Sequence, residues 1–554
     1  MCCVGSRAPN GGWSGWHSSV VAVTNVLIVG SGPAAAGAAL ALSAREGVAV
    51  TVIDIGVRLD TEGQQVVERL ASAEPDHWEP SLVERISAQP VSSGLRGVPE
   101  KRTYGSDYPF RNVGQLDGLT ADEDATTSLI SAAYGGYSNV WGSQLMPFTS
   151  SAFNSWPIDA SAMSTHYGAV LNEIPYAAEV DDLAENFPLM HRADPLPPLS
   201  DRSRRVLHAY DRHRSAMKAR GITMGKARLA FRARDCVRCR LCMTGCPYGL
   251  IYSASQTFDA LQRSGRVTLH HGLMALRISE EDDRASVVAR ELATGGTRRF
   301  EADRVFIACG TLGTTRLVAS SLNLFDVDLP ILESQQFILP MLSLRASVDP
   351  RQEPDFTLSQ FNMLVAPGGD SADMAQLHFY TFNPSFIESL PSWVRADRMG
   401  KVQGQLLRRL SVALGYLPSW RSPRLFACVR KSSGDRGLPD MHISRGSAPG
   451  GRNHMLRSVV AQLARSATRL DLYPVLPMLR LAAGGKSYHV GGSFPHSAVR
   501  SGRLTSDRLG RVAPWRRVHL IDASVFPNVP AMTFTLTIMA NAHRIACETM
   551  ELGS

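Results

Sequence analysis

The stretch Val26-Leu27-Ile28-Val29-Gly30-Ser31-Gly32-Pro33-Ala34-Ala35 joins a short apolar run to a glycine-rich turn, and an alanine-rich segment continues to Ala44. A second apolar run, from Val48 to Ile53, ends in Asp54. This order predicts a strand, a tight turn, a helix and a second strand, which together begin a parallel α/β sheet.

The turn has the residue types that a bound pyrophosphate requires. Gly30 allows the tight turn, Gly32 lets the backbone approach a phosphate, and Ala35 is small enough for the helix to pack on the strand. The helix N-terminus directs its partial positive charge at the same place. Asp54 follows at about the 20-residue spacing expected for a carboxylate on a ribose hydroxyl. The segment therefore predicts a dinucleotide site; the alternative is a packed turn without a ligand.

Length and composition limit the class of protein. The chain has 554 residues, more than one ordinary core accommodates, so we expect two closely packed domains. It is 44% hydrophobic and 19% charged, as globular proteins are. No apolar run reaches the roughly 18 residues that span a bilayer. Residues 1–24 lack the apolar segment of a signal peptide, so we expect a disordered lead and a cytoplasmic location.

The net charge of +8 is spread along the chain without a visible nucleic-acid module, so we expect no nucleic-acid partner. Two segments, 202–234 and 395–431, are the most basic. The second combines arginines with apolar residues and tryptophans at helical spacing. It predicts a helix that either packs on the second domain with a solvated basic face or makes peripheral contact with an anionic membrane.

Four of the nine cysteines, Cys236, Cys239, Cys242 and Cys246, form the pattern C-x2-C-x2-C-x3-C, followed by Pro247. This spacing matches the bacterial ferredoxin run, whose thiolates bind an iron–sulfur cluster. Zinc is a second interpretation, although zinc modules usually supply two separated ligand pairs. A metal-free structural knot is a further interpretation, although disulfides within it would be unusual in a reducing cytosol.

The remaining patterns predict an α/β fold whose Rossmann-type first domain is assembled from discontinuous segments. Residues 25–329 form its first part, with a cysteine-rich insertion at about 230–255, and residues 481–554 return to it. Residues 330–480 alternate as strands do and predict a second, α+β domain built on an antiparallel sheet. Residues 59–129 are polar and irregular, as in long surface excursions.

Several segments together resemble the glucose–methanol–choline family of flavin oxidoreductases over nearly the whole chain. The turn at 30–35 is similar to that family's adenine-dinucleotide motif, Gly135–Gly142 to its flavin-binding loop, and Ala308–Thr311 to its return strand. The most specific similarity is the closing run His519–Pro527, continued by Thr535–Ala542.

The resemblance implies FAD as the cofactor. The cysteine run with Pro247-Tyr248-Gly249 resembles the branch that holds sugar and polyol dehydrogenases, fatty-alcohol oxidases and sterol oxidases, of which some bind an iron–sulfur cluster here and others do not. The residues expected at the FAD are Gly30, Gly32, Pro33, Ala34, Ala35, Asp54, Ser138, Asn139, Trp141, Gly142, Met274, Ala308, Gly310, Asp522, Ala523 and Thr535.

The same resemblance implies oxidation of an alcohol, in which a base takes the hydroxyl proton and a hydride passes to flavin N5. His489 falls at the family's catalytic histidine, and imidazole suits the role of the base. The second histidine or asparagine of the family is replaced by Thr533, a poorer base with a shorter reach. Alternatives are that His489 acts alone, that His496 or His543 substitutes, or that the flavin does other chemistry.

We therefore expect FAD-dependent oxidation of a CH–OH group of a sugar, polyol or other hydroxylated metabolite. With a cluster present, electrons would pass to a quinone, cytochrome or ferredoxin rather than to oxygen. The alternatives are an oxygen-using sterol or lipid-alcohol oxidase and, from another class, a flavin-bearing electron-transfer or scaffold protein.

Overall fold

The computed structural model describes residues 23–88, 102–111, 118–123, 125–126, 130–370, 372–381, 400–431, 437–446, 454–499 and 502–552. The predicted lead lies outside this part of the chain, apart from its last two residues.

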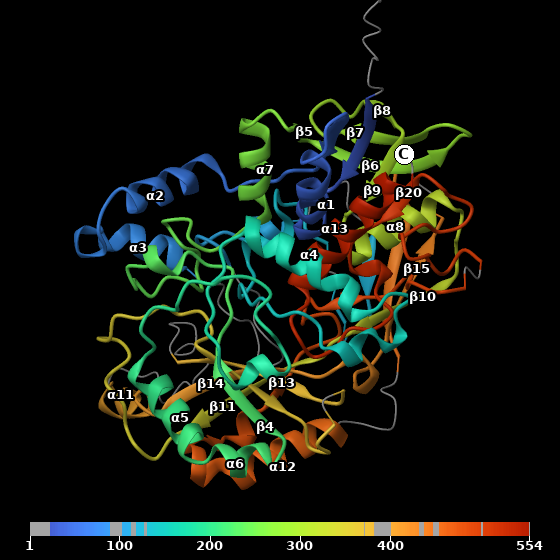
Figure 1. Ribbon diagram of the computed structural model, residues 1–554. Helices are drawn as coiled ribbons and strands as arrows, with labels where there is room; N and C mark the ends of the chain where they lie inside the picture. The colour runs from blue at the N-terminus through green and yellow to red at the C-terminus, as the bar shows by residue number, and fades with distance from the viewer. Residues whose placement is uncertain are drawn as a thin grey trace, which may run out of the picture.

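A five-stranded parallel sheet forms the centre of the first domain, in the upper half of Figure 1. Its strands come from discontinuous segments of the sequence, as predicted. Strand β1 lies between the second strand and the return strand. The β2 edge pairs with β5 and the β9 edge pairs with β20. The strands are β1 (Thr24–Val29), β2 (Val48–Ile53), β5 (Val267–His270), β9 (Arg304–Ile307) and β20 (Val518–Leu520).

Helices from opposite ends of the chain pack on this sheet. Helix α1 (Pro33–Ser43) follows the glycine turn, and α13 (Thr535–Glu551) lies beside it (Figure 1). The approach is so close that a Cβ on Gly37 would lie 2.2 Å from the carbonyl oxygen of Met539. Helix α4 (Ala160–Glu173) packs on α13, and α7 (Ala254–Arg263) contacts α1.

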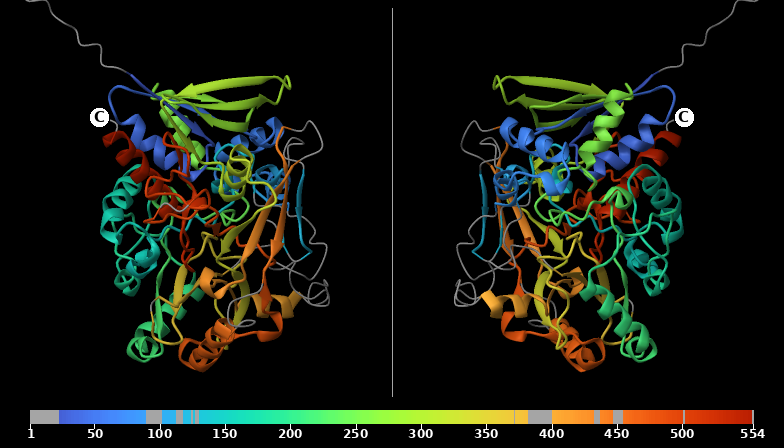
Figure 2. Two further views of the ribbon diagram at one scale, coloured as in Figure 1. Left: turned by 90° about the vertical axis from the view of Figure 1, so that its right-hand side faces the viewer. Right: turned by 90° about the vertical axis from the view of Figure 1, so that its left-hand side faces the viewer.

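A three-stranded antiparallel sheet follows α7 and lies at the top of both views in Figure 2. It consists of β6 (Leu273–Glu280), β7 (Ala285–Glu291) and β8 (Thr297–Ala302), and β7 and β8 form a hairpin around Thr294. After β9 the chain enters α8 (Thr311–Ser321), as the apolar run and glycine turn predict.

The second domain is built on a seven-stranded antiparallel sheet in the lower half of Figure 1. One edge strand, β4, comes from before residue 330, so the sheet extends beyond the predicted boundary. Its lower side carries α5 (Asp201–Arg212), α6 (Arg214–Lys218) and α12 (His454–Leu470). The strands are β4 (Ile222–Lys226), β11 (Gln336–Leu342), β12 (Phe361–Val365), β13 (Ala375–Tyr380), β14 (Leu410–Tyr416), β17 (Tyr473–Pro474) and β18 (Arg480–Leu481).

A mixed five-stranded sheet is the fourth sheet of the described chain, and a short strand just after His489 forms its edge. Its strands are β19 (Val490–Gly491), β10 (Asp328–Glu333), β15 (Leu425–Arg430), β16 (Asp440–Arg445) and β3 (Leu119–Ala121).

Two local predictions are wrong. Residues 400–431 contain one short helix, α11 (Gly400–Leu407), and otherwise form β14 and β15 instead of an amphipathic helix. The reason is that β14 is a central strand buried on both faces, so its apolar residues do not alternate and their spacing resembles that of a helix. Residues 395–399 of the segment lie outside the described chain.

Residues 61–87 are also more regular than predicted, because they form α2 (Thr61–Ala71) and α3 (Pro80–Ser87). Asp60 caps α2 by accepting a hydrogen bond from the Gly63 amide at 2.8 Å, and Val66 and Leu70 are buried beneath the helix.

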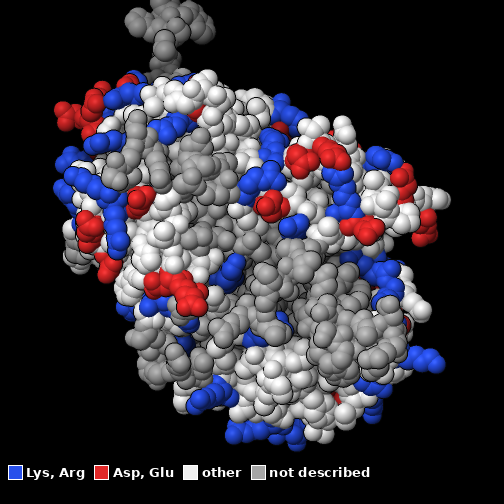
Figure 3. All heavy atoms as spheres, turned by 180° about the vertical axis from the view of Figure 1, so that it is seen from behind, with Lys and Arg blue, Asp and Glu red and all other residues white. Residues whose placement is uncertain are grey.

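None of the helices in the described ranges is long and apolar enough to cross a bilayer. On the face shown in Figure 3, acidic and basic side chains alternate over the upper half, and basic ones predominate along the lower edge.

Candidate active site

A cavity of about 280 Å³ lies at the carboxyl ends of the parallel strands, where it meets the seven-stranded sheet. The glycine turn, the end of β2, residues 131–144 and the turn after β9 form its first-domain wall. Strands β11, β13 and β14, with residues 486–490 and 522–538, close the other side. The cavity therefore joins the opening and closing parts of the chain, at the position where open α/β sheets bind ligands.

One face of the glycine turn packs against the backbone of Ala308, and the other face is open to the cavity. Gly30 has a φ of +108°, and a Cβ on it would lie 2.4 Å from the carbonyl oxygen of Ala308, so only glycine fits. A Cβ on Gly32 would meet nothing within 4 Å, so that face of the turn opens into the cavity. The Ser31 hydroxyl accepts a hydrogen bond from the Gly135 amide at 3.0 Å and ties the turn to the predicted flavin loop.

Asp54 lines the cavity with a carboxyl group whose Oδ1 is buried and has no hydrogen-bond partner. Burial raises the pKa of this carboxyl to about 7, although a hydrogen bond to Ser31 partly opposes the shift. A buried acceptor without a partner fits a ligand that donates hydroxyl groups, as the ribose of a dinucleotide does.

The closing segment places a second acid and a helix N-terminus at the cavity. Asp522 accepts hydrogen bonds from the Ser524 amide at 2.9 Å and from the hydroxyl of Thr314, although burial raises its pKa. Ala523 lines the cavity next to it, and Thr535, the first residue of α13, lines it from the helix N-terminus.

His489 and Thr533, the predicted catalytic pair, line the same cavity. Burial lowers the pKa of His489 to about 3, so its imidazole is neutral at ordinary pH. Its ring stacks on Tyr416, with centroids 4.6 Å apart, and meets the edge of Phe534 at 4.8 Å. The Thr533 hydroxyl is buried without a hydrogen-bond partner.

The backbone before His489 is held in an unusual conformation. Tyr488 has a φ of +57°, in the left-handed region that residues with side chains rarely adopt. The His489 amide donates to the Ser487 hydroxyl at 3.1 Å, and Glu333 accepts bonds from Gly485 and Ser487. The catalytic candidate is thus positioned by β10 of the mixed sheet.

Sequence reasoning missed the side of the cavity that the second domain supplies. Tyr416 lies between His489 and His378, whose ring centroid is 5.1 Å away, and its hydroxyl accepts a hydrogen bond from Gln336 at 2.9 Å. Tyr380 completes this polar wall. No motif marks these residues, because each is one position on a buried strand.

Three residues predicted at the FAD do not line the cavity. Ala35 is fully buried in α1. Met274 is 2% exposed and packs under β6 against Ala132, because a long apolar side chain at that strand position points into the core. Asn139 faces a neighbouring cavity, and its amide supports the loop by donating to the carbonyls of Tyr134 and Gly136. The predicted residues that line the cavity are Gly30, Gly32, Pro33, Ala34, Asp54, Ser138, Trp141, Gly142, Ala308, Gly310, Asp522, Ala523 and Thr535.

The two alternative histidines lie elsewhere. His496 is 3% exposed and is bonded through Nδ1 to the Asp507 carbonyl at 2.6 Å and through Nε2 to Asn541 at 3.3 Å. His543 lies on α13 and faces His166 of α4, with the two Nδ1 atoms 2.9 Å apart. Neither lines the cavity, so neither replaces Thr533.

The cysteine run borders a second cavity of about 230 Å³, lined by Cys242 and Cys246. Ser138, Val140 and Trp141 line both this cavity and the larger one, so one loop separates the two. All four thiols of the run are free, and burial raises the pKa of each.

The spacing of these thiols bears on the metal they suit. Within the described chain, only one group of three or more potential ligands has its ligand atoms within 4.8 Å of one another, and it excludes this run. Two thiolates on one zinc ion lie at most about 4.6 Å apart, twice the bond length. In an iron–sulfur cluster each cysteine binds a different iron, so the sulfurs are farther apart.

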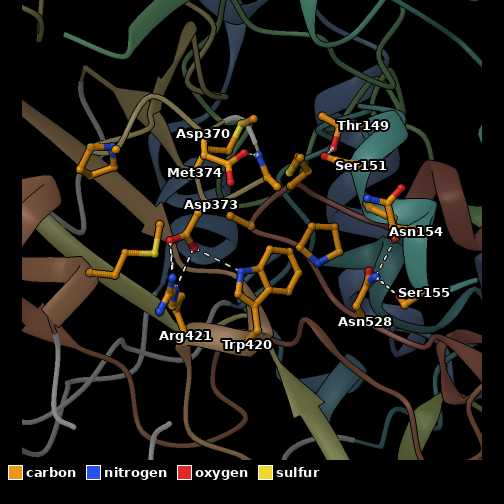
Figure 4. Close-up of a pocket in the computed structure, with 18 of the residues that line it drawn as sticks. Thr149, Ser151, Asn154, Ser155, Asp370, Asp373, Met374, Trp420, Arg421 and Asn528 are labelled. Carbon is orange, nitrogen blue, oxygen red and sulfur yellow. Dashed lines mark hydrogen bonds and ion pairs between the residues drawn. The ribbon is translucent and has the colours of Figure 1, made fainter. Parts of the chain in front are cut away.

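A third cavity, of about 840 Å³, opens between the domains (Figure 4). On one side of it, Asp373 and Arg421 form a bidentate ion pair with distances of 2.7–2.9 Å. The opposite side carries Asn154, Ser155 and Asn528. Its floor approaches the first cavity through an apolar cluster that contains Met374, Met532 and Tyr416. Of these, Tyr416 also lines the first cavity, and Met532 precedes Thr533.

In comparisons by sequence, the chain matches no protein-family model and no curated protein. By fold it is similar to solved structures, among them that of pyridoxine 4-oxidase from Mesorbium loti. That similarity has a TM-score of 0.57 at 13% identity and covers 95% of this chain and 99% of that chain. The chain therefore has the fold of that protein over nearly its whole length, as the resemblance to the glucose–methanol–choline family predicts.

Proposed function

We propose that this protein binds FAD in the first cavity and oxidises a CH–OH group of a sugar, polyol or other hydroxylated metabolite to a carbonyl. The observation that carries the proposal is that the glycine turn, Asp54, His489 and Thr533 line one cavity. The unpartnered Asp54 oxygen and the open face of Gly32 fit the ribose and the pyrophosphate of FAD. The fold shared with pyridoxine 4-oxidase agrees with this assignment.

When bound, FAD accepts a hydride, which removes two electrons and one proton from the alcohol carbon. His489 supplies the other half of the reaction, because its neutral ring takes the hydroxyl proton as the carbonyl forms. Thr533 donates or accepts one hydrogen bond at the same oxygen and orients it. Tyr416 stacks on the His489 ring and keeps it in one orientation.

We further propose that Cys236, Cys239, Cys242 and Cys246 bind an iron–sulfur cluster that passes electrons to a quinone, a cytochrome or a ferredoxin. The loop shared by the two cavities supports a short path from the flavin. Backbone amides of Arg238 and Thr357 donate to the sulfurs of Cys236 and Cys242 at 3.4 Å, as in the hydrogen bonds that tune such clusters.

The third cavity is proposed as the approach for the substrate. Met374 and Met532 line it and belong to the same apolar cluster as Tyr416, whose ring stacks on His489.

The test is anaerobic mixing of the purified, FAD-loaded protein with a panel of sugars, polyols, sterols and fatty alcohols while flavin absorbance is followed. Bleaching by a sugar or polyol, with iron and sulfide in the protein and no peroxide on turnover in air, is the expected result. Bleaching by sterols with peroxide release would instead support an oxygen-using lipid-alcohol oxidase. If the protein retains flavin and no alcohol in the panel bleaches it, the result would support an electron-transfer or scaffold role.

A further inference from the structure

Two histidines and a cysteine meet on the surface between α4 and α13, away from the cavities described above. His166 lies on α4, and His543 and Cys547 lie on α13. The Nδ1 atoms of the two histidines are 2.9 Å apart, and the Cys547 sulfur is 3.6 Å from Nδ1 of His543. Within the part of the chain that the structure describes, this is the only group of three potential metal ligands that lie within 4.8 Å of one another.

The arrangement follows from helix geometry. His543 and Cys547 are four residues apart, so both side chains project from one face of α13. Helix α4 packs along that face and brings His166 to them. Bond lengths of about 2.0 Å for nitrogen and 2.3 Å for sulfur place ligand atoms about 3.3–3.6 Å apart around tetrahedral zinc. The sulfur–nitrogen distance agrees with this geometry, and the imidazole nitrogens lie slightly closer.

The charges around the group permit a cation. Burial lowers the pKa of both histidines, to about 4 for His543, so both rings are in the neutral form that binds metals. Arg45 and Arg544 are the neighbouring cations, and each is already paired, with Glu551 at 3.1 Å and with Glu548 at 3.2 Å. All three candidate ligands are partly exposed, so an ion can enter from solvent.

We propose that His166, His543 and Cys547 bind one zinc ion, with water at the fourth position. Binding transfers the thiol proton of Cys547 to solvent and forms two nitrogen bonds and one sulfur bond to zinc. The ion joins α4 to α13, which packs directly on the helix that follows the glycine turn. The site thus links two helices behind the dinucleotide cavity, outside the cavities described above.

The experiment measures zinc in the FAD-loaded protein after dialysis against zinc and then against metal-free buffer. We expect about one zinc per chain at this site, with a zinc-edge absorption spectrum that reports two nitrogens and one sulfur from the protein. Thermal unfolding should shift to higher temperature when zinc is added. The double variant His166→Ala, Cys547→Ser should lose this zinc and the thermal shift.

Matched variants separate the site from other thiols and imidazoles. Cys547→His should keep the zinc with a nitrogen-only spectrum, which shows that the double variant's loss reflects ligands and not folding. His191→Ala, an exposed histidine, and Cys428→Ser, a cysteine on β15, should leave zinc content unchanged. A spectrum with four sulfurs that the double variant retains would assign the zinc to the cysteine run. That result would overturn the proposal, and so would the absence of retained zinc. In either case His166, His543 and Cys547 would be a hydrogen-bonded group without a metal.

Discussion

The ionisation of Asp54 should make the binding of FAD depend on pH. Its pKa of about 7 arises because burial in the cavity disfavours the charged form. Ribose hydroxyls donate more strongly to the ionised carboxylate than to the neutral acid. FAD therefore binds the ionised form, and its affinity should rise between about pH 6 and pH 8, by at most tenfold per pH unit. Fluorescence titration of FAD-free protein with FAD at a series of pH values measures this.

The variant Asp54→Asn is the control, since an amide cannot ionise. It should bind FAD more weakly at pH 8 and with no dependence on pH over this range. A wild-type affinity that falls as the pH rises would contradict the assignment of Asp54 to the ribose.

His489 provides the catalytic prediction at this scale. Replacing it with alanine removes the base that takes the hydroxyl proton, so flavin reduction should slow by about 10²–10⁴-fold. Stopped-flow absorbance under anaerobic conditions measures the rate, and FAD content measured on the same sample shows whether the cavity is intact. Thr533→Val, which removes one hydrogen bond and no base, should slow the reaction by about tenfold.

The pH profile gives a second readout of the same residue. Burial keeps His489 deprotonated well below neutrality, so the wild-type rate of flavin reduction should stay level between about pH 8 and pH 6. A decline with a midpoint near 6.5 would contradict the lowered pKa of His489. An unchanged rate in His489→Ala would remove this histidine from the mechanism.

At the scale of elements, the turn between β1 and α1 offers two glycines with different roles. Gly32 has extended backbone angles that alanine also adopts, and its missing Cβ faces the open cavity. Gly32→Ala should therefore leave the unfolding temperature of the FAD-free protein nearly unchanged but weaken FAD binding by about tenfold or more, because the methyl group occupies the place of the pyrophosphate.

Gly30→Ala is the matched variant. Its Cβ would collide with the Ala308 carbonyl at a positive φ, so it should lower stability by more than about 1 kcal/mol as well as FAD binding. Thermal unfolding and FAD titration of both variants separate the two effects. Gly32→Ala protein that binds FAD as tightly as wild type would show that no phosphate approaches this turn.

The elements also show what the sequence can predict. The parallel sheet was predictable because β1, β2 and β9 are short apolar runs that end at glycine turns or an acid, a local signal. Strand β14 was not predictable, because a strand buried on both faces has no alternation and its neighbours are distant in sequence. The same reason hides Tyr416, which reaches the candidate site only when β14 pairs with β11 and β13.

At the scale of the whole molecule, the cleft between the domains governs access to the catalytic pair. Ser458 lies on α12 and lines this cleft, whereas its neighbour Arg457 is exposed and does not. Ser458→Trp should fill part of the 840 Å³ space and lower kcat/KM by about tenfold with FAD content unchanged. Steady-state kinetics with the substrate found in the alcohol panel measures this.

Arg457→Trp places the same bulk on the same helix outside the cleft and should leave kcat/KM unchanged. Equal effects of the two substitutions would mean that substrate reaches the catalytic pair by another path.

The central claim is that the opening turn and the closing segment bind one FAD between them. The most direct measurement is the amount of FAD released on denaturation of the purified protein after incubation with excess FAD and gel filtration. We predict about one FAD per chain, lost in Gly30→Ala. A colourless protein that retains no FAD after this treatment would contradict it.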